Sequence, residues 1–245
     1  MKPISARRPT FIEPMQALPV AKLPDGDWLY EVKLDGYRAL AFKDGKDVRL
    51  ISRNNKPLNY PQLLDSLKLL AVEQVILDGE IVALDEKGRS SFQLLQVYKS
   101  SQQCVPLVYY AFDLLFLEGK DLRKEPLSVR RKLLAEALKK APENIRLSEG
   151  LQGSKEDLLR VAQEFGLESL VAKRLDSLYE SGRRSGAWVK VKNDQISRIR
   201  YRRLHPARRK PQIFRFLTGW VPRPGRPLVC RQSWDRLFRE TVGEH

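Results

Sequence analysis

Hydrophobic and polar residues alternate along the first 192 residues with the periods of short strands and amphipathic helices. Alternating or continuously apolar stretches predict strands over residues 28–33, 38–42, 48–51, 75–84, 105–117, 169–173 and 187–192. Apolar residues at helical spacing predict helices that begin near Pro61, Phe92, Ser128 and Ser154. Strands therefore outnumber helices, no internal repeat is visible, and the expected fold class is α+β.

Two of these helices have residues typical of capping. Ser128 is placed to cap its helix, and Ser154 with Asp157 three residues later forms a capping-box pattern. Gly166 is expected to end the second of these helices. Residues 193–245, by contrast, show little periodicity, so they predict an irregular tail.

The octet Glu31-Val-Lys-Leu-Asp-Gly-Tyr-Arg38 is the segment most indicative of chemistry. Lys33 lies at a strand end, with Glu31 two residues before it and Asp35 two residues after it. A lysine amine that becomes neutral in a buried position can attack a carbonyl carbon or a phosphorus. The alternative is a surface lysine beside an ordinary turn at Asp35-Gly36.

Composition narrows the possible functions. The 245 residues, 42% of them hydrophobic, can form one large domain or two small ones. No apolar run approaches the roughly 20 residues of a membrane span, and the N-terminus lacks a signal-peptide pattern, so a cytoplasmic protein is expected. Only two histidines (His205 and His245) and two cysteines (Cys104 and Cys230) are present, which argues against Ser-His-Asp hydrolysis, a zinc site or a disulfide framework.

The net charge of +15 predicts an anionic partner, and nucleic acid fits better than a membrane. The charge is uneven, because residues 193–245 contain 12 Arg and one Lys against four acidic residues. These residues therefore account for +9 of the total. We expect two parts, a domain over residues 1–192 and an Arg/Pro-rich basic tail over 193–245.

Six segments follow one another in a distinctive order: Lys33-Leu-Asp-Gly-Tyr-Arg38, Ser52-Arg53-Asn54, Leu77-Asp-Gly-Glu-Ile-Val82, Phe112-Asp-Leu-Leu115, Glu168-Ser-Leu-Val-Ala-Lys173 and Trp188-Val-Lys-Val-Lys192. Together they resemble the collinear motifs of covalent nucleotidyltransferases, and in particular ATP-dependent DNA ligases. With Phe11-Ile-Glu-Pro-Met15, they are most similar to the ligase domain of bacterial end-joining ligases. The resemblance covers residues 9–192 and implies an ATP-grasp-like nucleotidyltransferase core of antiparallel sheets flanked by helices.

The resemblance also implies residue roles. Lys33 would be the catalytic nucleophile that becomes joined to AMP. The residues expected to bind ATP or AMP are Glu31, Lys33, Arg38, Arg53, Glu80, Phe112, Lys173, Lys190 and Lys192. Asp35, Glu80 and Glu168 would hold Mg²⁺ or Mn²⁺, and Arg183 and Arg184 would contact DNA.

Simple chemistry agrees with several of these roles. Guanidinium groups such as those of Arg38 and Arg53 offer a planar fork of donors to phosphate or ribose. Lys190 and Lys192 are two apart on a predicted strand, so they share one face and leave the valines on the other. Phe112 can stack on a purine, although an aromatic residue in an apolar strand can equally belong to the core.

The sequence departs from the ligase pattern in three places. Ser169 and Asn55 stand where glycine is common, and asparagine tolerates the left-handed conformation better than most residues. The third departure is the basic tail, which shows no strand alternation where such ligases continue into an OB-fold of about 70 residues. We expect that the tail replaces a lost OB-fold, through a frameshift for example.

The predicted function is that of an ATP-dependent DNA ligase. It would seal 5′-phosphate/3′-hydroxyl nicks through a lysyl-AMP intermediate, in DNA repair or end joining. Its expected partners are nicked or broken double-stranded DNA and other end-joining proteins. Two alternatives stay open, namely an RNA ligase or guanylyltransferase and a truncated relic that binds nucleotide or DNA without sealing.

Overall fold

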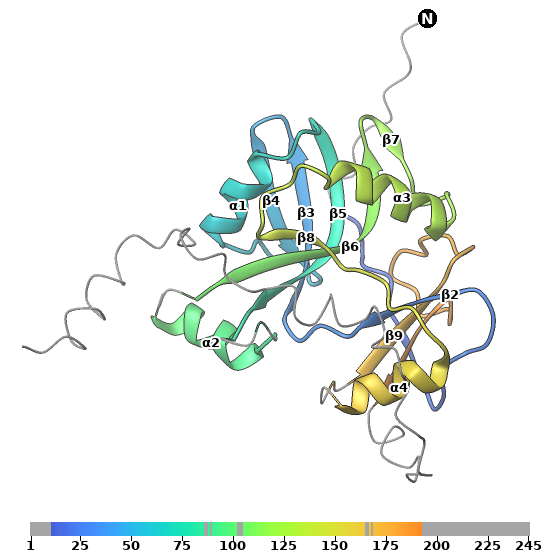
Figure 1. Cartoon of the computed structure of the whole chain (residues 1–245). Coiled ribbons are helices and arrows are strands. Elements are labelled where there is room, and N and C mark those ends of the chain that lie inside the picture. The colour runs from blue at the N-terminus through green and yellow to red at the C-terminus, as the bar shows by residue number, and fades with distance from the viewer. Residues whose placement is uncertain are drawn as a thin grey trace, which may run out of the picture.

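Two β-sheets, with helices packed on their outer faces, make up the computed structural model of the chain (Figure 1). The structure describes residues 11–85, 88, 90–101, 105–164, 167 and 169–192. The smaller sheet has the strand order β1-β10-β9-β2, and the larger sheet has the order β4-β3-β5-β6-β7, with β8 paired to β6. All neighbouring pairs are antiparallel except β1 with β10 and β6 with β8.

The elements follow one another along the chain in an α+β order. The strands are β1 (Leu18–Val20), β2 (Trp28–Val32), β3 (Tyr37–Asp44), β4 (Asp47–Ser52), β5 (Gln74–Ala83), β6 (Leu107–Leu117), β7 (Lys120–Asp121), β8 (Ile145–Leu147), β9 (Ser169–Arg174) and β10 (Trp188–Lys192). The helices are α1 (Pro61–Lys68), α2 (Phe92–Ser101), α3 (Leu127–Ala137) and α4 (Lys155–Glu164).

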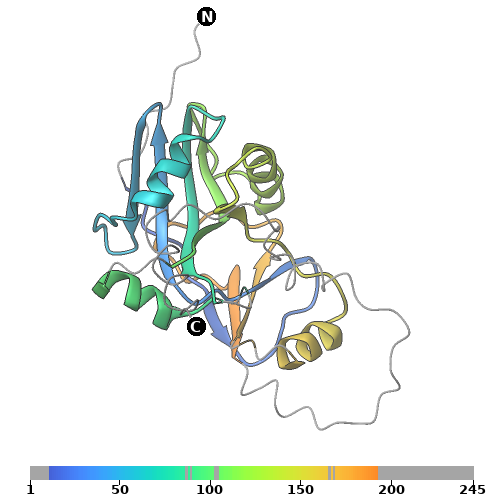
Figure 2. The same ribbon diagram turned by 60° about the vertical axis from the view of Figure 1, so that its left-hand side comes forward.

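The cores show which faces of the two sheets meet. The outer face of the smaller sheet packs Leu170 and Val191 against Leu158 and Val161 of α4. The outer face of the larger sheet forms a separate core with α1 and α3. The inner faces share a third core, in which Trp188 of β10 packs with residues of β3 and β5. In Figure 2 the smaller sheet accordingly lies between α4 and the larger sheet.

Every strand and helix predicted from the sequence is present, with the predicted strand boundaries and helix starts shifted by up to two residues. The Ser154 cap is confirmed, since its hydroxyl accepts a hydrogen bond from the Asp157 N–H at 3.1 Å. The Ser128 cap is wrong, because Pro126 occupies the N-cap position and Ser128 lies within the first turn. Gly166 lies outside the described residues, as do Glu168 and the whole of the predicted tail.

Glycine is needed at two motif positions because other atoms approach it closely. A Cβ on Gly36 would lie 2.1 Å from the Ile81 carbonyl oxygen, and a Cβ on Gly79 would lie 2.5 Å from the Tyr109 ring. Asn55 adopts a φ of 55°, so the expected left-handed tolerance is used there. Ser169 has no positive φ, and serine in place of glycine is therefore free of backbone strain.

None of the helices in the described part of the chain is both long and apolar enough to span a bilayer.

Candidate functional site

Four predicted site residues lie on the inner face of the smaller sheet. The strand register aligns Glu31 with Val171 and Val171 with Lys190. Directly paired residues, and residues two apart on one strand, share a face. The residues that share this face with Trp188 are Glu31, Lys173, Lys190 and Lys192. Lys33 directly follows β2, and its N–H donates to the Ser169 carbonyl at 3.1 Å. Val189 and Val191 are buried on the other face, which confirms the placement predicted for the two β10 lysines.

Glu31 and Lys173 form an ion pair in the interior. The Lys173 Nζ lies 2.5 Å from Oε2 of Glu31, and both side chains are only 3% exposed. Arg131 Nη1 lies 3.2 Å from Oε1, but Oε1 accepts no hydrogen bond from any residue that the structure describes. Burial lowers the pKa of Lys173, although the charge of Glu31 opposes the shift. One carboxylate oxygen of Glu31 is therefore buried beside Arg131 without accepting a hydrogen bond from the described residues.

Phe112 occupies a β-bulge that directs it toward this ion pair. Between β5 and β6 the register passes from Asp78–Asp113 to Gly79–Ala111, so Phe112 has no partner on β5. Its ring centroid lies 4.1 Å from the Lys173 Nζ, and its carbonyl accepts hydrogen bonds from Arg131 and Lys173 at 3.2 and 3.4 Å. The bulge thus brings a backbone oxygen and an aromatic ring of the larger sheet to the face that contains Lys173.

Arg38 of β3 approaches the same aromatic residues from the larger sheet. Its Nε and Nη2 donate to the two oxygens of Asp78 at 3.0 and 2.6 Å, and Asp78 is fully buried. The guanidinium carbon lies 5.3 Å from the Phe112 centroid and 5.7 Å from that of Trp188. Burial lowers the pKa of Arg38, but pairing with Asp78 more than offsets this and leaves the pKa above its ordinary value. The guanidinium therefore stays charged.

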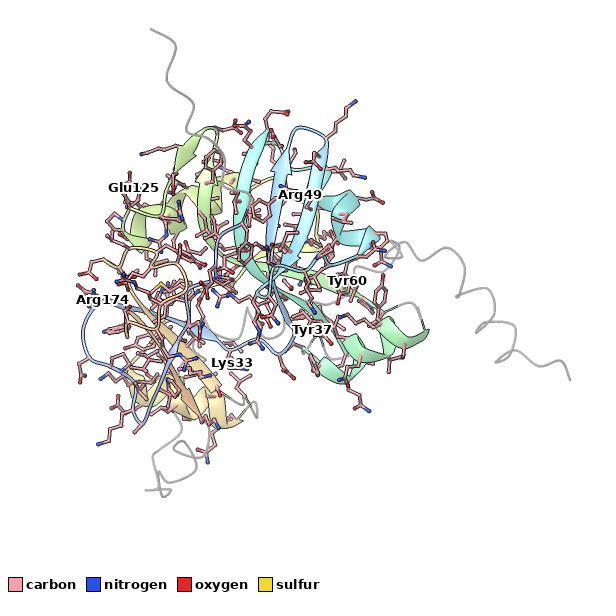
Figure 3. The ribbon with its side chains drawn as sticks, turned by 180° about the vertical axis from the view of Figure 1, so that it is seen from behind. Lys33, Tyr37, Arg49, Tyr60, Glu125 and Arg174 are labelled. Atoms are coloured by element: carbon pink, nitrogen blue, oxygen red, sulfur yellow. The ribbon has the colours of Figure 1, made fainter. Side chains whose placement is uncertain are left out.

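Glu80 links Lys33 electrostatically to the larger sheet. It is paired with Arg38 in the β3–β5 register. The pKa of Glu80 is raised to about 7, because burial outweighs the charges of Arg38 and Lys33, which lower it; Asp35 is among the groups that raise it. Lys33 is half-buried in the connection between β2 and β3, where the chain passes from one sheet to the other (Figure 3). The amine and both carboxylates therefore belong to one electrostatic site.

The family described as ATP dependent DNA ligase domain matches residues 12–192. The chain belongs to this family. The match covers the whole of the site and nearly all of the described residues, so the predicted ligase resemblance is confirmed.

Two relatives illustrate how far the ligase-domain similarity extends. The multifunctional non-homologous end joining protein LigD of Pseudomonas aeruginosa is 41% identical over 187 residues, which are 75% of this chain and 22% of that protein. DNA ligase C1 of Mycolicibacterium smegmatis is 41% identical over 202 residues, with coverage of 74% and 56%. The chain thus spans less than two thirds of each relative.

Solved structures show the same fold. A mycobacterial DNA ligase D complexed with ATP and MES gives a TM-score of 0.64 at 36% identity, over 74% of this chain and 60% of that one. The ligase domain of Mycobacterium tuberculosis LigD gives 0.63 at 37% identity, over 74% and 59%. The α+β nucleotidyltransferase fold predicted from the sequence is therefore confirmed for this ligase domain.

The remaining predicted residues surround the site less closely. Arg53 lies in an exposed turn after β4 and forms no hydrogen bond or ion pair with another described residue. Arg183 and Arg184 are exposed in the loop before β10, where the Arg183 carbonyl accepts from the Gln16 N–H and Arg184 donates to the Gln16 side chain. Glu168, a predicted metal ligand, lies outside the described residues.

Sequence reasoning assigned no role to four residues that shape the site of this ligase domain. Asp78 and Trp188 lie inside two of the six motifs, so their positions could have indicated a role in the site. Arg131 and Tyr179 lie in none of the six motifs. Arg131 donates to the Phe112 and Ser148 carbonyls, and Tyr179 donates to Asp78. Only the folded chain reveals these contacts, because they join distant parts of the sequence.

The raised pKa of Glu80 predicts a specific pH dependence of stability. A carboxyl with a folded pKa of about 7 and an ordinary value of 4.5 stabilises the fold below pH 4.5, and this contribution is lost as pH rises through 7. In chelator-treated protein, we expect the free energy of unfolding of the wild type to fall by about 1–3 kcal/mol more than that of Glu80→Gln between pH 5 and pH 8. Urea unfolding at both pH values measures the difference, and parallel pH profiles would contradict the assignment.

Proposed function

We propose that this chain is an ATP-dependent DNA ligase that seals 5′-phosphate/3′-hydroxyl nicks through AMP attached to Lys33. The observation that supports this best is the position of Lys33. It follows β2 in the connection between the two sheets, its N–H donates to the Ser169 carbonyl at 3.1 Å, and its charge acts on Glu80 of the larger sheet. An amine whose charge acts on a carboxylate of the facing sheet supports the proposal, since nucleotidyl transfer to lysine needs an amine in a charged site.

The reaction consists of three displacements at phosphorus. The neutral Lys33 amine attacks the α-phosphorus of ATP, so a P–N bond forms, pyrophosphate leaves and the amine proton is lost. A 5′-phosphate oxygen of DNA then attacks the AMP phosphorus and releases the lysine. The 3′-hydroxyl finally attacks the 5′-phosphorus, which closes the phosphodiester and expels AMP. Lys190 and Lys192, which share a face with Glu31 and Lys173, are assigned to the charge of the triphosphate.

The adenine is assigned to Glu31 and Phe112. Oε1 of Glu31 accepts no hydrogen bond from the described residues, and a carboxylate oxygen suits the exocyclic amino group of adenine as an acceptor. Guanine presents a carbonyl at that position, which would repel the carboxylate. The Phe112 ring offers a stacking surface, and Arg38 and Arg53 offer donors to ribose or phosphate. The relative solved with ATP supports the choice of nucleotide.

The carboxylates suit Mg²⁺ or Mn²⁺ better than a metal held by protein alone. In the described part of the chain, no three histidine, cysteine or carboxylate side chains lie together so that they could hold a metal ion. Mg²⁺ commonly uses one or two carboxylates together with phosphate oxygens and water, which Asp35 and Glu80 can provide. Burial raises the pKa of Glu80 to about 7 even though the charges of Arg38 and Lys33 lower it, so a further cation would favour its ionised form. When bound, the cation would neutralise charge on the departing pyrophosphate, and Glu168 is assigned as a further ligand.

Nicked or broken double-stranded DNA is the proposed substrate, with Arg183 and Arg184 as phosphate contacts and other end-joining proteins as partners. We expect Arg183→Ala and Arg184→Ala each to weaken binding to nicked DNA uniformly across sequences. Each should reduce the slope of log K against log salt by about 1. Fluorescence anisotropy over a salt series measures this slope. Lys46→Ala in the exposed β3–β4 turn is the control. Equal slopes for the wild type and all three variants would show that the loop before β10 does not contact DNA.

The direct test of function is sealing by the purified chain. Incubation with a nicked DNA duplex, ATP and Mg²⁺ or Mn²⁺ should give multiple-turnover joining, and EDTA should stop it. GTP should not replace ATP, and an RNA nick should be joined more slowly. Faster joining of RNA, or labelling by GTP, would favour RNA ligation or guanylylation. Failure to join any nick, including one already adenylated, would favour a relic that only binds.

A further inference from the structure

Tyr179 connects three segments that are far apart in the sequence. Its hydroxyl donates to Oδ2 of Asp78 at 2.7 Å and accepts from the Met15 N–H at 3.0 Å. Its own N–H donates to the Arg123 carbonyl at 2.9 Å, and its ring packs edge-on against Trp188 at 5.7 Å. The ring and backbone of Tyr179 are therefore fixed, and its buried hydroxyl both donates one hydrogen bond and accepts one.

The oxygen of Asp78 that Tyr179 contacts is the one that holds the tip of Arg38. Oδ2 accepts from Arg38 Nη2 at 2.6 Å and from the Tyr179 hydroxyl at 2.7 Å. Burial raises the pKa of Tyr179 well above its ordinary value, and the charge of Asp78 raises it further, so the hydroxyl remains a donor. Among the described residues, Arg38 Nη1 makes no hydrogen bond, and the side chain is 19% exposed. The guanidinium thus has free donors whose direction depends on Asp78.

We propose that Tyr179 is a positioning residue for Arg38. Its hydroxyl fixes the Asp78 carboxylate, which fixes the guanidinium so that Nη1 can donate to the ribose or phosphate of the nucleotide. The inference rests on the proposed function for the role of Arg38. Without the hydroxyl, the buried carboxylate loses one of its three hydrogen bonds and is free to turn about its last bond, and the guanidinium turns with it.

Tyr109 provides a matched control for a purely structural role. It is also fully buried in the same region, and its hydroxyl donates to the Ala39 and Leu77 carbonyls at 3.0 and 3.2 Å. Tyr109→Phe therefore removes buried hydrogen bonds without removing one from the Asp78 carboxylate. A loss of activity that follows stability alone should appear in both phenylalanine variants.

The first test measures lysyl-AMP formation in a double-mutant cycle. We expect Tyr179→Phe to slow the step at saturating ATP by about 10-fold, and Tyr109→Phe to slow it less than about twofold. When Arg38 is already replaced by alanine, Tyr179→Phe should slow it by less than about twofold, since no guanidinium is left to position. Equal slowing by both phenylalanine variants, or an undiminished effect of Tyr179→Phe without Arg38, would overturn the proposal.

The second test does not depend on catalysis. The Arg38 Nε–H signal in a ¹⁵N spectrum is identified by its absence in Arg38→Lys, and its hydrogen exchange is compared among the variants. We expect exchange to become about 10-fold faster in Tyr179→Phe and to stay unchanged in Tyr109→Phe. Unchanged exchange in Tyr179→Phe would overturn the positioning role even if the wild type seals DNA. A wild type that forms no adduct but shows the expected exchange would overturn the proposed function alone.

Discussion

Lys33→Arg should reduce adduct formation with ATP by at least about 10³-fold. Arginine preserves the positive charge that acts on Glu80, so the electrostatics of the site are largely retained. A guanidinium is not deprotonated in proteins, however, and therefore has no lone pair with which to attack phosphorus. The substitution therefore removes the amine that would attack phosphorus but keeps its positive charge. A gel assay with α-labelled ATP measures the loss.

Two controls limit how this result can be explained. Lys46→Arg, in the exposed turn between β3 and β4, should label like the wild type. Lys33→Arg should still join a nick that already has AMP on its 5′-phosphate, because that step does not use the lysine as a nucleophile. Substantial labelling of Lys33→Arg would show that another residue accepts the AMP.

Arg130→Met should destabilise the domain by about 3–5 kcal/mol. Arg130 and Asp113 are both fully buried, and their two hydrogen bonds are each 2.8 Å long. Methionine fills much of the volume but leaves the Asp113 carboxylate charged and unpaired in the interior. The free energy of unfolding in urea measures the effect. Asp113 adjoins Phe112 in β6, so this pair also supports the bulge at the site.

An exposed pair of the same type is the control. Arg174 donates to Asp176 at 2.6 Å, but the two side chains are 53% and 77% exposed. Arg174→Met should therefore change stability by less than about 0.5 kcal/mol. Replacing both Arg130 and Asp113 by apolar residues should restore part of the loss, since no buried charge is left unpaired. A loss under about 1 kcal/mol in Arg130→Met alone would contradict this account of the core.

Local pattern was enough to predict much of this fold. The alternation of Val189 and Val191 with Lys190 and Lys192 predicted two faces, and the register shows both. The strands that the pattern missed, β1, β7 and β8, have three residues or fewer, which is too short for a period to emerge.

The site was predictable only where one short motif held the relevant residues. Lys33 and Asp35 lie in such a motif, and the charges of both act on the pKa of Glu80. The contacts of Tyr179 with Asp78 and Met15 span 101 and 164 residues, and no local pattern encodes them. The bulge at Phe112 likewise depends on how β5 and β6 pair. Tertiary pairing, not residue preference, decides these features.

Mass spectrometric mapping of AMP on the intact chain tests the role of Lys33 most directly. After incubation with ATP and Mg²⁺, we predict one AMP per chain, located on the peptide that contains Lys33 and removed by added pyrophosphate. AMP on Lys173, Lys190 or Lys192 instead, or no covalent AMP under conditions in which the chain seals nicks, would contradict it.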